Sequence, residues 1–283
     1  MVASMAGFAL EDMLIKRLST GLPTSQIVLM IGLAGMAVFA LLARMRGEAV
    51  APRAVFGRAV MLRNLGEAVG VVGFVTALAL VPLSVASAIL QGLPLVATLG
   101  AVLFLGETVG WRRWSAIAVG FAGMLIIVRP FGQGFDPAAL FAVLGVAGLA
   151  LRDLATRRVA GAVTSVQLAI WGFAALLPAS IVLAPFGDTA PRMPVAAEWV
   201  QFAAILVLSV SAYWMMTIAS RVGDVSFVAP FRYSRMVFAL ILGWLAFSER
   251  PDTAMLIGSA MIVGSGLYTF FRERALSTRR VRR

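Results

Sequence analysis

Two arginines lie inside a stretch that is otherwise almost entirely apolar, and they are well suited to bind a charged ligand. Arg232 and Arg235 are spaced i, i+3, which puts both on one side of a helix. A charge at the centre of a bilayer costs about 2.5–3.5 kcal/mol on insertion scales, so such a residue usually has a function. Because a guanidinium offers paired donors to a carboxylate, we predict that Arg235 holds a ligand carboxylate and that Arg232 assists. The alternative is a structural ion pair with one of three acidic residues: Glu11, Asp12 or Asp153.

An acidic pair near the start of the chain could bind a positively charged group. Glu11 and Asp12 could bind an ammonium group or titrate with protons, since the chain has no histidine for that task. The alternative is a pair between Asp12 and Lys16, which are spaced i, i+4. We expect ordinary salt bridges rather than ligand contacts at two further charged pairs: Arg152–Asp153 and Arg63–Glu67.

Four uncharged residues complete the candidate set. Gln91 lies in the middle of an apolar run, where hydrocarbon cannot satisfy its amide, so it should face the protein interior. Tyr233 lies between the two arginines, while Tyr213 and Trp214 lie deep in another apolar run. We predict that Gln91 and Tyr233 line a cavity; for Gln91 an interhelical hydrogen bond is an equal alternative. Tyr213 and Trp214 would form an aromatic wall for an apolar ligand group, although plain packing explains them equally well.

The composition requires a lipid environment. The chain is 61% hydrophobic and 13% charged, with a mean hydropathy of +0.95, whereas soluble domains are roughly 45–50% apolar and about 25% charged. It has no cysteine or histidine and no recognisable catalytic or phosphate-binding motif, so we expect no enzyme, metal site or cofactor. Despite a net charge of +11, we expect no nucleic-acid partner, because the arginines lie between apolar runs.

Apolar runs long enough to cross a bilayer recur ten times along the chain. A helix needs about 20 residues to span roughly 30 Å of hydrocarbon. Short connections marked by glycine and proline separate the runs. We therefore predict an all-α integral membrane protein with ten transmembrane helices, near residues 2–18, 24–44, 61–80, 82–105, 111–128, 137–157, 164–184, 197–219, 223–247 and 253–271.

The chain is also an internal duplication. Gly7-Phe8-Ala9-Leu10-Glu11-Asp12 matches Gly148-Leu149-Ala150-Leu151-Arg152-Asp153 at an offset of 141 residues, and an offset of 142 pairs Ser84 with Ser226 and Glu107 with Glu249. We expect two repeats, residues 1–130 and 136–272, and a basic cytoplasmic tail at 273–283. Because five spans per repeat is an odd number, the second repeat enters the membrane with the opposite orientation. This gives an inverted five-plus-five repeat, an arrangement typical of transporters.

The distribution of basic residues predicts the orientation. With both termini in the cytoplasm, sixteen basic residues lie on the cytoplasmic side, against five on the other: Lys16, Arg17, Arg129, Arg192 and Arg250. The positive-inside rule therefore favours cytoplasmic N- and C-termini. We expect a multi-pass membrane protein in this orientation.

The ends of the fourth and ninth predicted spans share a motif. Leu103-Phe104-Leu105-Gly106-Glu107 and Leu245-Ala246-Phe247-Ser248-Glu249 are each followed by a glycine-rich span. With the duplication, these motifs resemble the drug/metabolite transporter superfamily, specifically its EamA-like members, over essentially the whole chain. Members of this family usually have a proline in the middle of the span that carries the motif, and here it is Pro94 in the fourth span. Met236 stands at the matching position of the ninth span, which argues against a matching kink there. The resemblance implies a ten-helix carrier and, more narrowly, a likeness to the bacterial exporters of amino acids, including aromatic ones. It therefore also implies a location in the bacterial inner membrane.

Together these features predict a secondary-type carrier that exports small metabolites, above all amino acids, including aromatic or large neutral ones, by alternating access. Its partners would be a small-molecule substrate and the lipid bilayer, and we expect a monomer. The alternatives are an exporter of a nucleobase, a sugar or a cationic compound, a lipid flippase, and a channel. A strictly cationic substrate would fit Glu11 and Asp12 better than the arginines.

Overall fold

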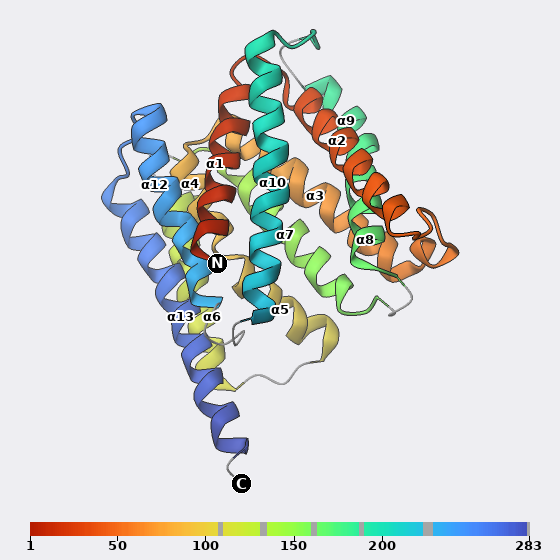
Figure 1. The fold of residues 1–283 in the computed structure, drawn as a ribbon. Helices are drawn as coiled ribbons and strands as arrows, with labels where there is room; N and C mark the ends of the chain where they lie inside the picture. The colour runs from red at the N-terminus through yellow and green to blue at the C-terminus, as the bar shows by residue number, and fades with distance from the viewer. Residues whose placement is uncertain (107–109, 131–134, 160–162, 187–189, 223–228, 282–283) are drawn as a thin grey trace. The chain divides into compact units, whose positions relative to one another are not determined.

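The protein is helical throughout the part that the structure describes. The computed structural model describes every residue except 107–109, 131–134, 160–162, 187–189, 223–228 and 282–283, and the described residues include no β-strand. Figure 1 shows the α-helices: α1 (Val2–Leu18), α2 (Thr24–Met45), α3 (Arg58–Leu80), α4 (Leu83–Leu90), α5 (Leu93–Leu105), α6 (Trp111–Val128), α7 (Ala139–Thr156), α8 (Ser165–Ala174), α9 (Leu176–Leu183), α10 (Ala196–Val222), α12 (Ser234–Phe247) and α13 (Thr253–Val281). Three short 3-10 helices join them: η1 (Arg53–Phe56), η2 (Ala184–Phe186) and η3 (Ala229–Tyr233). The predicted all-α fold is confirmed.

Seven stretches of the described residues are long and apolar enough to cross a membrane: Thr24–Met45, Arg58–Leu80, Leu83–Leu105, Ala139–Thr156, Ser165–Leu183, Ala196–Met216 and Thr253–Arg272. The other three predicted spans are shorter. Helix α1 has 17 residues, the apolar part of α6 runs Trp114–Val128, and α12 has 14 residues. A multi-pass membrane protein follows from the seven, while ten crossings stay a prediction. Helix α13 continues to Val281, so most of the predicted tail extends the last helix.

Two of the predicted spans are interrupted just before a proline. Helix α4 ends at Leu90 and α5 begins at Leu93, and the break at Gln91 and Gly92 precedes Pro94, the second residue of α5. Helix α8 likewise gives way to α9 at Ala175, before Pro178. Proline lacks the N–H that a helix interior needs and its ring clashes with the preceding turn, so each break lies at the expected place.

The matching position of the second repeat shows a change of helix type, although Met236 stands where the first repeat has Pro94. There η3 ends at Tyr233 and α12 begins at Ser234, and Tyr233 is the residue that an offset of 142 pairs with Gln91. Pro230 lies within η3, on the other side of the break. In the second repeat the proline lies before the change of helix type, whereas in the first repeat it lies after the break.

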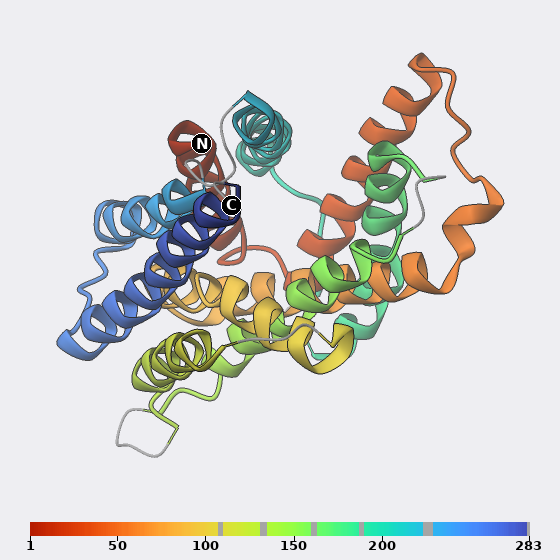
Figure 2. The same ribbon diagram turned by 90° about the horizontal axis from the view of Figure 1, so that it is seen from below.

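The chain forms two compact units, and each contains residues of both repeats. The first unit consists of Met1–Leu14, Val81–Ala139 and Val207–Arg283. Within it α13 packs along α6, as Figure 1 shows, and α12 packs against α4. The second unit consists of Ile15–Leu80 and Leu140–Leu206. Within it α2 packs against α8 and α9, and Figure 2 shows α2 and α8 side by side.

Small residues allow the first helix of each repeat to approach the third helix of the other. In the second unit, a Cβ added at Gly148 of α7 would lie 2.3 Å from the backbone nitrogen of Gly70 in α3. In the first unit, a Cβ added at Gly7 of α1 would lie 3.0 Å from the Cβ of Ala212 in α10. The offsets of 141 and 142 relate Gly7 to Gly148 and Gly70 to Ala212. Both units therefore use the same positions for close helix contact.

Candidate substrate-binding site

All eight predicted site residues belong to the first unit: Glu11, Asp12, Gln91, Tyr213, Trp214, Arg232, Tyr233 and Arg235. The centre of this candidate site is an ion pair between α1 and α12. Arg235 Nη2 lies 2.8 Å from both carboxylate oxygens of Asp12, and Arg235 Nε lies 3.1 Å from Oδ2. The Asp12 side chain is 3% exposed and the Arg235 side chain 20%. Of the structural partners considered for Arg235, the structure therefore pairs it with Asp12.

Phe8 adds an aromatic face to this ion pair. The guanidinium carbon of Arg235 lies 5.2 Å from the centre of the Phe8 ring, within the range of a cation–π contact. Phe8 and Asp12 are spaced i, i+4 on α1, so both reach the same guanidinium from one helix face. Phe8 is not among the predicted site residues, and in the sequence only its i, i+4 spacing from Asp12 indicates such a role.

Glu11, one residue before Asp12, has a different environment. The hydroxyl of Ser209 in α10 donates a hydrogen bond of 2.6 Å to Glu11 Oε1. Among the described residues, Glu11 forms no ion pair, although its side chain is only partly exposed. Lys16, the nearest basic residue in the sequence, donates a hydrogen bond to the carbonyl oxygen of Leu78 at 3.1 Å. Glu11 is thus a carboxylate held by a neutral group.

Gln91 and Tyr233 lie at the helix breaks. The amide nitrogen of Gln91, which is buried, donates to the backbone carbonyl oxygen of Arg232 at 3.4 Å, and this bond joins the breaks of the two repeats. Tyr233 lies against α13, where a Cβ at Gly266 would overlap its hydroxyl. Arg232 itself is exposed, unlike Arg235. A break of this kind frees backbone carbonyls for polar contacts, and Arg232 contributes one to Gln91.

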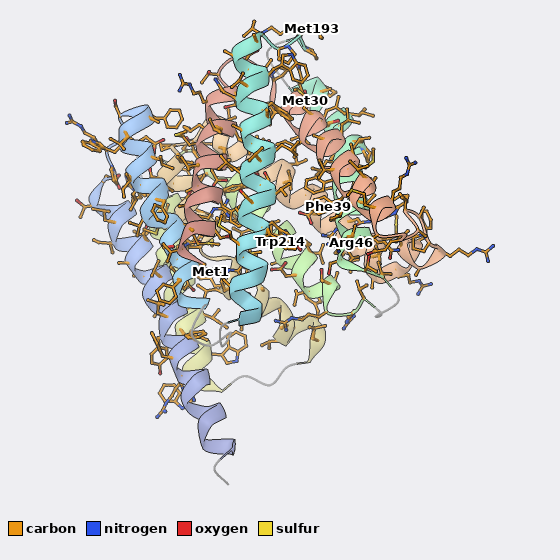
Figure 3. All side chains as sticks on the ribbon, in the orientation of Figure 1. Met1, Met30, Phe39, Arg46, Met193 and Trp214 are labelled. Atoms are coloured by element: carbon orange, nitrogen blue, oxygen red, sulfur yellow. The ribbon has the colours of Figure 1, made fainter. Side chains whose placement is uncertain are left out.

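The predicted aromatic wall lies on exposed surface of α10. Tyr213 is 45% exposed and Trp214, labelled in Figure 3, is 59% exposed. Both belong to the first unit, as does Ser209 one turn earlier on the same helix. Their exposed rings are available to a ligand or to lipid.

A second polar cluster, in the second unit, links charged pairs that the sequence suggested separately. The expected Arg63–Glu67 and Arg152–Asp153 salt bridges are present at 3.0 and 2.9 Å. In addition, Arg152 Nη1 lies 3.2 Å from Glu67 Oε1, which joins α3 to α7. Arg63 also donates to the carbonyl oxygen of Leu168 at 2.7 Å. The result is a continuous ionic network rather than two isolated pairs.

The two polar clusters occupy matching positions in the repeats. An offset of 141 relates Glu11 to Arg152, and an offset of 142 relates Ser209 to Glu67. The contact between Glu11 and Ser209 is therefore the counterpart of the contact between Arg152 and Glu67. In the second unit a salt bridge occupies the position; in the first unit a carboxylate meets a hydroxyl. Of the two carboxylates, Glu67 pairs with a cation, whereas Glu11 has a neutral partner, the Ser209 hydroxyl.

Comparison with known proteins identifies the family. A profile of the EamA-like transporter family matches residues 1–129 and 136–271. The chain belongs to the EamA-like transporter family. Members of this family are transporters and not enzymes, so the protein is a membrane transporter of small metabolites, and the expectation that it is not an enzyme is confirmed.

Several curated bacterial proteins are similar to this transporter. A riboflavin transporter of Rhizobium johnstonii is 32% identical over 75% of the chain and 70% of its own length. An S-adenosylmethionine uptake transporter of Rickettsia felis is 26% identical over 78% and 74%, and a pseudopaline exporter of Pseudomonas aeruginosa is 29% identical over 90% and 89%. These relatives are named for other substrates than amino acids, so the narrower resemblance to amino-acid exporters gains no support from them.

A solved structure supports the fold. A crystal structure of another protein, 22% identical in sequence, matches with a TM-score of 0.59 over 97% of this chain and 98% of its own. At this identity the match concerns the fold alone.

Proposed function

We propose that this transporter is a secondary carrier for amino acids and related zwitterionic metabolites, which it exports by alternating access. The observation that carries the proposal is the ion pair between Asp12 and Arg235. A guanidinium that binds one carboxylate through paired donors can bind another in the same way. The relatives named for S-adenosylmethionine, a derivative of an amino acid, are consistent with such a substrate.

A zwitterion can insert between Asp12 and Arg235 and pair with both, without changing the net charge inside the membrane. The substrate carboxylate would replace Asp12 on Arg235, and the substrate ammonium would bind the released Asp12 and its neighbour Glu11. Every buried charge then keeps a partner, which matters because an unpaired buried charge costs several kcal/mol. In this proposal Arg232 assists, and the remaining residues line the cavity: Gln91, Tyr233, Tyr213 and Trp214.

Glu11 is the group that we propose for coupling to a proton gradient. Its partner is the neutral hydroxyl of Ser209, so a proton can bind Glu11 without breaking a salt bridge. Asp12 is less suited, since it holds Arg235 through both oxygens. Proton binding at Glu11 and substrate binding at Arg235 would then alternate within one unit.

The proposed membrane arrangement follows from the duplication. Corresponding helices of the two repeats meet in the pairs α6–α13 and α4–α12, which supports an inverted five-plus-five repeat with boundaries near 1–130 and 136–272. We place the N- and C-termini in the cytoplasm of a bacterial inner membrane, with the chain acting as a monomer. Export is proposed from the family resemblance, and the relatives include both uptake and export proteins.

A second candidate is a carrier of organic cations. The observation that favours it is Glu11, a carboxylate without an ion pair among the described residues. In this case the cation would bind Glu11, and the Asp12–Arg235 pair would stay closed as a structural element.

Flux measurements in liposomes test the proposal. Purified protein is reconstituted, and efflux of a labelled amino-acid mixture is followed with and without a proton gradient. We expect saturable, protein-dependent loss of particular amino acids, faster with a gradient. If folded protein moves no amino acid but moves a labelled organic cation, the second candidate replaces the first.

A further inference from the structure

A pocket lies where helices of the first unit begin or end. Its volume is about 240 Å³, and it lies beside the start of α4, the ends of α6 and α12 and the start of α13. The buried part of its lining is mainly apolar: Val81, Ile127, Val128, Ala139 and Met255. Its rim carries five charged residues: Arg129, Asp136, Glu249, Arg250 and Asp252. None of them belongs to the site built around Arg235.

Three of the rim charges already have strong partners. Glu249 accepts hydrogen bonds from the backbone nitrogens of Leu83 and Ser84, at 2.6 and 3.0 Å, and from the Ser84 hydroxyl at 2.7 Å. Arg129 pairs with Asp252. The backbone N–H of Met255 and this arginine hold the pKa of Asp252 below its usual value, so Asp252 stays ionised. These charges shape the rim but are occupied.

The other two rim charges are available. Arg250 is exposed and has no hydrogen bond or ion pair with any residue that the structure describes. Asp136 is exposed too; Oδ1 accepts from the backbone nitrogen of Ala138 at 2.9 Å, and Oδ2 forms no hydrogen bond with any residue that the structure describes. Within the described residues, the pocket therefore presents one cation and one carboxylate oxygen above an apolar floor.

We propose that this pocket binds a small zwitterion with an apolar side chain. The anionic group of the ligand contacts Arg250, the ammonium contacts Asp136, and the apolar part lies on the floor formed by Val81, Ile127 and Met255. The volume is below the roughly 300–1,000 Å³ of pockets for drug-sized ligands, so the ligand is no larger than an amino acid or a lipid headgroup. The site does not depend on the proposed transport function, which only guides the choice of probe.

Equilibrium binding tests this proposal apart from transport. Labelled L-leucine is titrated into purified Arg235→Gln protein, in which the first site lacks its guanidinium, in a non-ionic detergent. We expect saturable binding that weakens at least tenfold when Arg250→Gln or Asp136→Asn is added. Arg46→Gln, which removes an exposed arginine at the end of α2, is the matched control and leaves binding unchanged. Size-exclusion profiles confirm that each variant is folded.

Competition with lipids distinguishes the two possible sources of the zwitterion, a free amino acid and a lipid headgroup. If added phosphatidylethanolamine displaces leucine and phosphatidylglycerol does not, the site takes a zwitterionic headgroup; if neither does, it takes the free zwitterion. Either result supports the pocket as a zwitterion site. Absence of saturable binding of both leucine and phosphatidylethanolamine, or binding that ignores both pocket substitutions, overturns it. Leucine binding without any amino-acid flux would leave the pocket standing and refute the proposed function alone.

Discussion

At the scale of single residues, the proposed function depends on the Asp12–Arg235 pair. The Asp12 carboxylate is 3% exposed, and Arg235 compensates its charge through two nitrogens. In the proposed function, Asp12 competes with any anionic ligand for Arg235. The proposed ligand therefore offers a carboxylate to Arg235 and also a positive group to the Asp12 that it displaces.

Removing the guanidinium should abolish transport without preventing insertion. Arg235→Gln leaves Asp12 without its cation, which costs about 3 kcal/mol unless Asp12 takes up a proton. We expect loss of flux in liposomes and a lower unfolding temperature. The double variant Asp12→Asn, Arg235→Gln replaces the pair with two amides and should regain stability but not flux. Flux recovered in the double variant would assign the pair a purely structural role.

Glu11 should carry the response to a proton gradient. In Glu11→Gln the amide can still bond to Ser209 but cannot bind a proton, so we expect gradient-driven efflux to fall to the rate without a gradient. The matched control is Glu67→Gln in the corresponding contact of the second unit, where Glu67 forms a salt bridge with Arg152; this variant should keep the gradient response. An unchanged response to the gradient in Glu11→Gln would exclude this residue as the coupling group.

At the scale of helices, close contact between small residues positions the charged groups. Gly148→Ala forces a Cβ against the backbone of Gly70, and we expect a loss of about 1–3 kcal/mol from overpacking. Gly264→Ala on α13 is the matched control, because an added Cβ there meets nothing within 4 Å. That variant should be neutral or more stable by up to about 1 kcal/mol, since alanine favours a helix. Denaturation in detergent compares the two; equal effects would contradict the packing assigned to α3 and α7.

The helices themselves could be predicted from the sequence because hydrocarbon demands long apolar runs. The predicted spans near 2–18, 24–44 and 111–128 agree closely with α1, α2 and α6. In the ninth span, Pro230 favours a local opening of the helix, and the change of helix type lies just after it, whereas Met236 offers no proline at the position that matches Pro94. The capping role of Glu249 on α4 was not specified either, and its repeat counterpart Glu107 lies outside the described residues.

The partners of the charged residues could not be predicted, because they depend on tertiary contacts. For Arg235 the sequence allowed Glu11, Asp12 or Asp153, and helix periodicity does not choose among residues more than 80 positions away. The link between Glu67 and Arg152 was missed for the same reason, although the repeat offset relates it to the contact between Ser209 and Glu11. Local charge pairs such as Arg63–Glu67 were predicted correctly because their i, i+4 spacing is sufficient.

At the scale of the whole molecule, orientation in the membrane can be tested because the chain has no cysteine. Figure 3 labels Met193 and Arg46; Met193 lies near the start of α2, where Arg192 bonds to Gln26, and Arg46 follows its end. The 22 residues of α2 span about 33 Å. In intact cells, we expect a membrane-impermeant maleimide to label Met193→Cys and not Arg46→Cys. The reverse pattern would place the termini outside the cytoplasm.

The most direct measurement of the central claim compares an amino acid with its carboxamide. Once liposome flux has identified the amino acid that is moved fastest, its amide, which keeps the ammonium and side chain but lacks the carboxylate, is tested as substrate and competitor. If the substrate carboxylate replaces Asp12 on Arg235, the amide should neither be transported nor inhibit at concentrations tenfold above those of the amino acid. Equal transport or equal inhibition by the amide would show that Arg235 does not recognise a carboxylate.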